Sequence, residues 1–287
     1  MKNIKYFLQF SAIFLLFSFF KLLGLKYSSI ISGRIMQFFG PLFRSNKICD
    51  LNLTNAMPHL NHLQRKKIIK EMWNNYGKIL AEYIFLKKFR NSKNFSKKII
   101  IENKAILNSI RIDKKPVIFV SGHFNNFELM AMQIEKSGID LAAIYRPLNN
   151  KFLNPIMEDI RKKYICKKQI EKGKSGTKKL LKEFKNGASI ALMIDQRVSE
   201  GIECDFFSHK ALTTTIPAQF VKKFQAQIVP IYIERTIDEK FQMKIYEAIK
   251  FDKDETIETI TISLNKLLEK MIIKNPNQWI WTHNRWK

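Results

Sequence analysis

Two hydrophobic patterns follow one another along the second half of the chain, and together they predict an α/β fold. Short apolar runs of strand length alternate with stretches in which apolar residues recur every three or four positions. The strands are predicted at residues 116–120, 141–145, 189–194 and 228–233, with an edge strand at 241–249. The helices are predicted at residues 126–136, 150–164, 175–185, 215–225 and 255–273. This alternation indicates a mostly parallel central sheet that is flanked by helices on both faces.

The N-terminus carries a different pattern, a nearly continuous apolar segment over residues 6–25 that follows Lys2 and Lys5. As a helix it is about 30 Å long, which matches one bilayer core. We predict a transmembrane or membrane-anchor helix at residues 1–26 and one folded domain at 27–287. A cleaved signal peptide is the main alternative, but a clear small-x-small cleavage site is missing. A helix lying in the membrane plane is a further alternative.

The segment between the predicted anchor and the predicted sheet divides into two parts. Residues 30–60 show no clear period and are predicted to form an irregular or partly helical connector. Residues 62–89 are predicted to form a helix, because apolar side chains recur at spacings of three and four. These side chains are Ile68, Met72, Tyr76, Ile79, Leu80 and Ile84.

The net charge of +25, from 50 Lys and Arg against 25 Asp and Glu, indicates an anionic partner such as nucleic acid, an anionic membrane or an acidic protein. A codon bias toward Lys, Ile and Asn would produce a similar excess, so charge alone does not choose the partner. Cys49, Cys166 and Cys204 form no CxxC pair. This argues against a disulfide scaffold and a structural zinc site, and it fits a reducing, cytoplasmic compartment.

Polar side chains directly follow three of the predicted strands. His123 follows the first, Arg146 the second, and Asp195 with Gln196 the third. In open α/β sheets the ligand site lies beyond the carboxyl ends of the strands, so these side chains are candidates for one site. Glu128 lies five residues after His123, and a turn between them would let the carboxylate orient the imidazole of a general base. The alternative is a surface histidine near an acid that favours a helix start.

Several other chemistries lack their motifs. The sequence contains no Gly-x-Ser-x-Gly elbow, no His-Glu-x-x-His, no Walker A lysine motif and no dinucleotide glycine fingerprint. What remains is a base without a protein nucleophile, which would deprotonate a substrate hydroxyl for direct attack on an activated acyl group. We therefore expect neither a cofactor nor a metal ion.

Five stretches, in order along the chain, resemble the late lipid A acyltransferases, the lauroyl/myristoyl transferase family of the bacterial inner membrane. They are the His-x4-acid motif at 122–128, a Tyr-Arg-Pro segment at 144–149, an acid at 193–196, a Phe-Phe loop at 206–215 and a Trp-x-His ending at 281–287. The chain departs from the family pattern at Asn125-Asn126-Phe127, where Gly-Asn-Trp is frequent. It also departs at Ser208 and Asn284, where glycine and arginine are usual.

The resemblance implies transfer of an acyl chain from acyl carrier protein to a hydroxyl of a lipid A precursor, without a covalent enzyme intermediate. It assigns the general base to His123 and the orienting acid to Glu128, and Arg161 and Asp195 match positions tied to activity. Arg146 is the best candidate for a phosphate or carboxylate contact. For both arginines, surface salt bridging is the alternative.

The resemblance also implies a location in the inner membrane with the catalytic domain on the cytoplasmic side. A basic face would then attract acidic acyl carrier protein and the anionic inner leaflet. Two other functions stay open. One is a glycerolipid, aminolipid or glycolipid acyltransferase of the same His-x4-acid superfamily. The other is a membrane-tethered basic protein that binds nucleic acid, although no nucleic-acid motif is visible.

Overall fold

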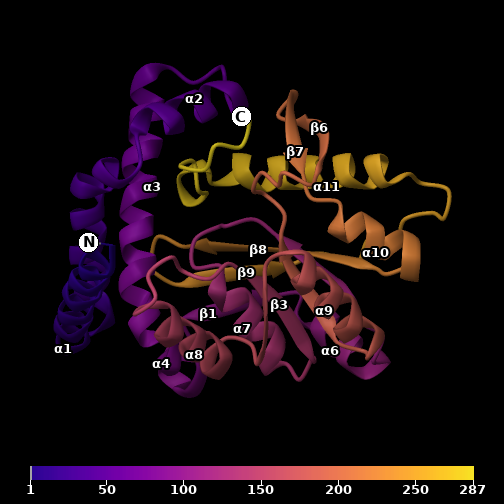
Figure 1. Ribbon diagram of the computed structural model, residues 1–287, viewed down its shortest axis with the longest axis horizontal. Helices are drawn as coiled ribbons and strands as arrows, with labels where there is room; N and C mark the ends of the chain where they lie inside the picture. The colour runs from indigo at the N-terminus through magenta and orange to yellow at the C-terminus, as the bar shows by residue number, and fades with distance from the viewer. Residues whose placement is uncertain (1) are drawn as a thin grey trace.

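The computed structural model describes the fold of residues 2–287, and it is built around a seven-stranded sheet (Figure 1). The strand order is β1-β9-β8-β2-β5-β3-β4, and all neighbours are parallel except β8 and β9. The strands are β1 (Ile99–Glu102), β2 (Ile118–Ser121), β3 (Leu141–Tyr145), β4 (Lys168–Glu171), β5 (Ser189–Met193), β8 (Ile228–Arg235) and β9 (Phe241–Ile245). The predicted α/β class is confirmed.

Helices cover both faces of this sheet, as parallel strands require. The helix α11 (Ile257–Lys274) lies across one face with α10 (Ile216–Phe224) near it (Figure 1). The other face carries α6 (Lys104–Asp113), α7 (Glu128–Lys136), α8 (Asn154–Tyr164) and α9 (Lys174–Lys185). The central strand β8 is buried along almost its whole length, which explains its continuous apolar sequence. The predicted helices of the second half are thus confirmed, with ends displaced by a few residues.

The prediction that residues 241–249 form an edge strand was wrong. The strand β9 pairs with β8 on one side and with β1 on the other, where Ile99 lies opposite Phe241. The sequence pattern missed β1 and β4 because each has only four residues and includes charged or amide side chains. It also missed a separate antiparallel hairpin, β6 (Ile202–Phe206) and β7 (His209–Thr213), which packs against α11.

The hairpin turns through Phe207 and Ser208, both in the left-handed region at φ 51° and 59°. Two such residues match the backbone twist that a two-residue hairpin needs, and glycine adopts this conformation without steric cost. Ser208 therefore takes the family's glycine position while keeping the glycine-type backbone.

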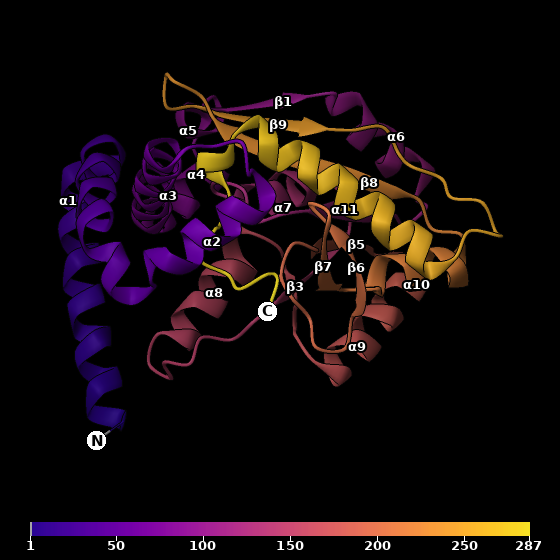
Figure 2. The same cartoon turned by 90° about the horizontal axis from the view of Figure 1, so that it is seen from above.

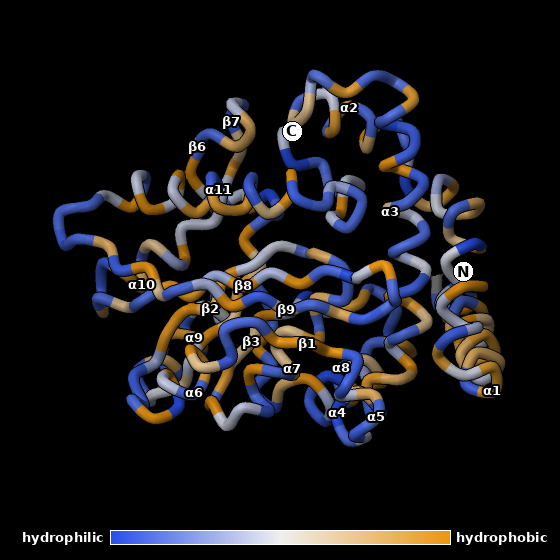
Figure 3. The backbone as a smooth tube through the Cα atoms, turned by 180° about the vertical axis from the view of Figure 1, so that it is seen from behind, coloured by the Kyte–Doolittle hydropathy of each residue, from blue (hydrophilic) through white to orange (hydrophobic). Residues whose placement is uncertain are grey.

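The N-terminal helix α1 (Lys2–Phe43) is much longer than predicted and bends sharply at Gly24, where φ is 76° and ψ is 170°. The hydroxyl of Ser28 donates to the carbonyl oxygens of both Phe20 and Gly24 at 2.6 Å, so the chain turns back on itself at this point. Figure 2 shows the two arms beside each other, and Figure 3 shows many hydrophobic residues in α1. Of the two alternatives predicted for residues 30–60, the irregular one was wrong and the helical one was too modest, since 30–43 belongs to this helix and α2 (Asn46–Ala56) follows.

The second arm of α1 packs on α3 (His62–Glu82), the helix that the apolar spacing predicted. Glycines bring the two helices close together. A Cβ atom added at Gly77 would lie 2.1 Å from the carbonyl oxygen of Ser32, and one at Gly40 would lie 2.3 Å from the Trp73 ring. At Gly77 the backbone of α1 lies so close that a larger residue would not fit. The second arm is therefore packed tightly against the folded domain and is not a free tether.

Candidate active site

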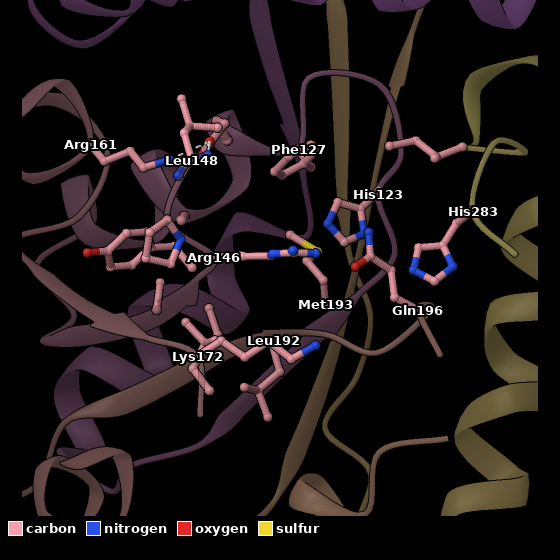
Figure 4. Close-up of a pocket in the computed structure, with 18 of the residues that line it drawn as sticks. His123, Phe127, Arg146, Leu148, Arg161, Lys172, Leu192, Met193, Gln196 and His283 are labelled. Atoms are coloured by element: carbon pink, nitrogen blue, oxygen red, sulfur yellow. Dashed lines mark hydrogen bonds and ion pairs between the residues drawn. The ribbon is translucent and has the colours of Figure 1, made fainter. Parts of the chain in front are cut away.

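A cavity of about 720 Å³ opens where β2, β3 and β5 end. Its lining includes five of the six residues predicted from the sequence, namely His123, Glu128, Arg146, Arg161 and Gln196. The sixth, Asp195, lies directly behind His123. The strands β3, β5 and β2 are adjacent and parallel, so their carboxyl ends meet at one edge. The prediction that side chains after successive strands come together is confirmed (Figure 4).

His123 is paired with Asp195, and the sheet register explains why. Ser121 of β2 lies opposite Met193 of β5, and His123 and Asp195 each follow two residues later. The ring atom Nδ1 of His123 lies 2.7 Å from Oδ1 of Asp195. The other oxygen, Oδ2, accepts hydrogen bonds from the backbone N–H of His123 at 2.7 Å and from Nε1 of Trp279 at 2.8 Å. A buried carboxylate with three donors is a strong fixed partner for the ring.

His123 and Asp195 each shift the pKa of the other. Burial alone would lower the pKa of His123, but the Asp195 carboxylate, with a smaller contribution from Glu128, raises the pKa above its ordinary value. Burial alone would raise the pKa of Asp195, but the charge of His123 and its hydrogen bonds hold that pKa well below its usual range. Asp195 is therefore ionised at neutral pH, and it favours the imidazolium form of His123.

Glu128 does not reach the His123 ring as the sequence predicted. Its Oε1 accepts two hydrogen bonds from Arg161, at 2.9 Å from Nε and 2.8 Å from Nη2, and one from the Tyr83 hydroxyl at 3.1 Å. The prediction of a hydrogen bond between Glu128 and the imidazole was wrong, because α7 begins at Glu128 and turns its side chain toward α8. Phe127 instead contacts the His123 ring edge to face, with ring centroids 4.8 Å apart.

The alternative reading of Arg161 as a surface salt bridge was wrong as well. The side chains of Arg161 and Glu128 are only 15% and 10% exposed, and both line the cavity. Removing one partner of such a pair leaves an uncompensated charge, so the two side chains act as a unit. Glu128 still influences His123 through space, since its charge contributes to the raised pKa of the histidine.

A buried polar network holds the loop between His123 and Glu128. The amide nitrogen of Asn125 donates to Asn75 and Gln278, both at 2.8 Å. The next residue, Asn126, donates to Glu82, whose carboxylate forms an ion pair with Arg235 at 2.7 Å. Asn125 itself takes a left-handed backbone at φ 41°, which asparagine tolerates better than most residues. Asn125, which stands where the family often has glycine, thus has a structural use here.

Arg146 and Gln196 lie in the cavity wall as predicted. In Figure 4 the guanidinium of Arg146 points into the cavity toward Met193. Arg146 forms no ion pair with any residue in the range 2–287, in contrast to Arg161. Arg146 therefore does not take part in a surface salt bridge within these residues, and its positive charge is available to an anionic ligand.

Among the polar lining residues that were missed as site residues are three with basic side chains. Arg44 directly follows α1, Lys172 follows β4, and His283 comes from the C-terminal segment. The Lys172 position follows a strand end, the same signal that found Arg146, but β4 itself was not recognised. His283 lies inside the Trp-x-His ending at 281–287, and the sequence pattern assigned it no role. In residues 2–287 there is no group of three His, Cys, Asp or Glu side chains suited to a metal ion.

Comparison with known proteins identifies relatives along most of the chain. Lipid A biosynthesis acyltransferase 2 of Shigella flexneri is 23% identical over 263 residues, which cover 88% of this chain and 81% of that protein. The lipid A biosynthesis lauroyltransferase of Escherichia coli (strain K12) is 24% identical over 255 residues, covering 85% and 79%. The myristoyltransferase of the same strain is 21% identical over 265 residues, covering 89% and 80%.

These relatives are all named as acyltransferases of lipid A biosynthesis. The family described as bacterial lipid A biosynthesis acyltransferase matches residues 1–287. The match includes both the α1 hairpin and the C-terminal segment that carries His283. The chain therefore belongs to the bacterial lipid A biosynthesis acyltransferase family.

Proposed function

We propose that this acyltransferase moves a fatty acyl chain from acyl carrier protein to a hydroxyl of a lipid A precursor, by direct transfer with His123 as the base. The observation that carries the proposal is the His123–Asp195 pair at the cavity wall. When Nδ1–H donates to the Asp195 carboxylate, the lone pair of Nε2 is left free to accept a proton. The hydrogen bond to Asp195 thus orients His123 to act as a general base, and the reaction needs no cofactor.

In the proposed reaction, Nε2 takes the proton of the acceptor hydroxyl while its oxygen attacks the thioester carbonyl carbon. The C–S bond then breaks, and the imidazolium returns the proton to the departing thiolate. Asp195 stabilises the imidazolium between these steps, in the role that an acid has in His-based dyads. Glu128 contributes its charge at longer range and holds Arg161 at the cavity wall.

The cationic lining favours an anionic acceptor or donor. Arg146, Arg44 and Lys172 lie on the cavity wall, and none of them has an ion-pair partner among residues 2–287. Phosphate groups of a lipid A precursor, or the phosphate of the carrier's prosthetic arm, would be bound by such side chains. The net charge of +25 would add long-range attraction for an acidic carrier protein.

The proposal is tested by incubating membranes that contain the protein with acyl carrier protein thioesters and a lipid A precursor, and reading the products by mass. The expected product is the precursor plus one acyl chain. Parallel reactions with acyl coenzyme A, and with glycerolipid, aminolipid or glycolipid acceptors, separate the alternatives within the superfamily. Acylation of one of those acceptors but not of lipid A precursors would overturn the assigned acceptor.

The proposed reaction needs access to a membrane lipid, and α1 is placed to provide it. Exposed apolar side chains occur on both arms, among them Phe14 and Leu22 before the bend and Phe38 and Leu42 after it. Residues 3–43 include a stretch apolar and long enough to cross a membrane. The first arm touches the loop after β3, where Phe7 packs on Phe152. We infer that the hairpin enters the bilayer beside the mouth of the cavity.

Because α1 turns back at Gly24, the N-terminus is expected on the same membrane side as the catalytic domain, in the cytoplasm. A single straight span would place the two on opposite sides. The three native cysteines are free and buried, so a cysteine introduced at Asn3 can be labelled selectively. The measurement compares labelling by an impermeant maleimide in spheroplasts and in inverted inner-membrane vesicles.

Labelling of Asn3→Cys is expected only in inverted vesicles, together with the control Lys266→Cys on the exposed face of α11. If Asn3→Cys reacts only in spheroplasts while Lys266→Cys reacts only in inverted vesicles, α1 spans the membrane as one helix and the hairpin is not its membrane form.

A further inference from the structure

His283 is the polar group of the cavity that the proposed mechanism leaves without a role. It lines the same cavity as His123, and Figure 4 draws it on the same side as His123 and Gln196. Its Nδ1 is buried without a hydrogen-bond partner. A buried ring nitrogen without a partner is uncommon in folded proteins, because it loses its bond to water and gains none. Because Nδ1 is closed to solvent, a ligand in the cavity meets the other ring nitrogen, Nε2. A proton on Nε2 leaves only a lone pair unsatisfied at Nδ1 and makes Nε2–H the one donor of the ring.

The segment around His283 is firmly held, so its ring position is not incidental. The amide of Asn52 donates to the carbonyl oxygens of both Trp281 and His283, each at 2.8 Å. The fully buried Arg285 donates to Thr213 Oγ1 at 2.6 Å. Trp279, at the start of the same segment, donates to the Asp195 carboxylate. The C-terminal segment is therefore anchored at several points, including the acid that orients His123.

The pKa values of the two histidines of the cavity are shifted in opposite directions. Burial lowers the pKa of His283, and the nearby positive charges of His123, Arg285 and Lys172 add to this, while Asp195 opposes it. His283 is thus neutral at pH 7, whereas Asp195 raises the pKa of His123. Environments that shift two titratable groups of one site in opposite directions assign them different roles. A neutral imidazole has one N–H to donate and holds its proton firmly.

We propose that His283 is a second catalytic residue, which donates a hydrogen bond to the acyl carbonyl oxygen of the donor as negative charge develops there. The inference rests on the proposed acyl transfer. When the acceptor oxygen attacks the carbonyl carbon, the C=O electron pair moves onto the carbonyl oxygen. When the C–S bond breaks, the C=O bond re-forms, and His283 keeps its proton throughout. A fixed donor of this kind stabilises the transition state more than the ground state.

The test is the rate of thiol release from an acyl thioester by His283→Ala, His283→Gln and the wild type. Thiol release reports acyl transfer to any acceptor, so a wrong acceptor lipid would overturn the proposed function without affecting this measurement. Removing one such donor is expected to lower kcat by about 10²–10³-fold. We expect KM to change little and the rise of rate with pH, which reports His123, to stay in place.

His283→Gln retains an N–H donor near the position of Nε2, and it is expected to recover part of the lost kcat. The control His59→Ala removes an exposed histidine far from the cavity lining and should leave kcat unchanged. Thermal unfolding is followed for every variant, because a purely structural role would lower the melting temperature. A loss below about threefold, a loss in KM alone, or a kcat loss in both His283 variants that follows their melting temperatures would overturn the proposal.

Discussion

Replacing His123 with alanine is expected to reduce acyl transfer by about 10²–10⁴-fold, the usual contribution of a general base. Glu128 is already hydrogen-bonded to Arg161 and Tyr83, and burial lowers the pKa of His283 whereas Asp195 raises that of His123, so neither side chain is arranged to replace the His123 ring. The attacking hydroxyl would have to lose its proton to water. The measurement is the initial rate of acyl transfer from acyl carrier protein thioester to the lipid acceptor.

The His123→Ala protein is expected to remain folded. Asp195 keeps two of its three donors, the backbone N–H of residue 123 and the Trp279 indole, so its buried charge is not left unpaired. The loop itself is held by Asn125 and Asn126, not by the imidazole. The same far-ultraviolet circular dichroism spectrum and a melting temperature close to that of the wild type are the controls. Wild-type rates from this variant would remove His123 from the mechanism.

The sequence predicted the site's location better than its connections. Residues after successive parallel strands were expected to meet, and His123, Arg146 and Gln196 do line one cavity. Which carboxylate bonds the imidazole depended on the register between β2 and β5, which joins residues 72 positions apart in sequence. Local spacing favoured Glu128 because it is near in the chain. The pairing of β2 with β5 instead brings Asp195 to the imidazole.

The errors in the fold have a similar cause. The helical course of residues 30–43 depends on packing against α3, where glycines allow close approach, and the apolar pattern alone does not reveal this contact. The bend in α1 rests on one glycine inside an otherwise continuous hydrophobic run. β1 and β4 have only four residues each, and pairing with β9 and β3 holds them in the sheet. β4 in particular has a mostly polar sequence that does not by itself favour a strand.

The substitution Asp195→Asn provides a sharper test of the pair, since it changes charge with little change in shape. In the wild type, Oδ2 accepts two N–H groups and Oδ1 faces the ring. The asparagine oxygen should keep the position that accepts two donors. This places the amide NH₂ against Nδ1 of His123, so that Nδ1 becomes an acceptor and the proton moves to Nε2. The base then faces the substrate in the wrong tautomer.

We therefore expect Asp195→Asn to lower the rate of transfer by an amount approaching that of His123→Ala, on the order of 10²–10⁴-fold. The remaining activity should also have a different pH dependence. In the wild type the rate rises with pH as His123 loses its proton, with a midpoint above the ordinary histidine value because Asp195 offsets the effect of burial on the pKa. Without that charge, burial dominates, and the midpoint should move to lower pH.

Glu128→Gln is the matched comparison, because it removes the other carboxylate charge near His123. Glu128 has a smaller effect than Asp195 on the pKa of His123 and does not bond its ring. Its midpoint is expected to move less, and the tautomer of His123 should stay correct. Rate–pH profiles of the three proteins decide between the carboxylates. A larger shift in Glu128→Gln than in Asp195→Asn would return the role of partner acid to Glu128, five residues along the chain from the histidine.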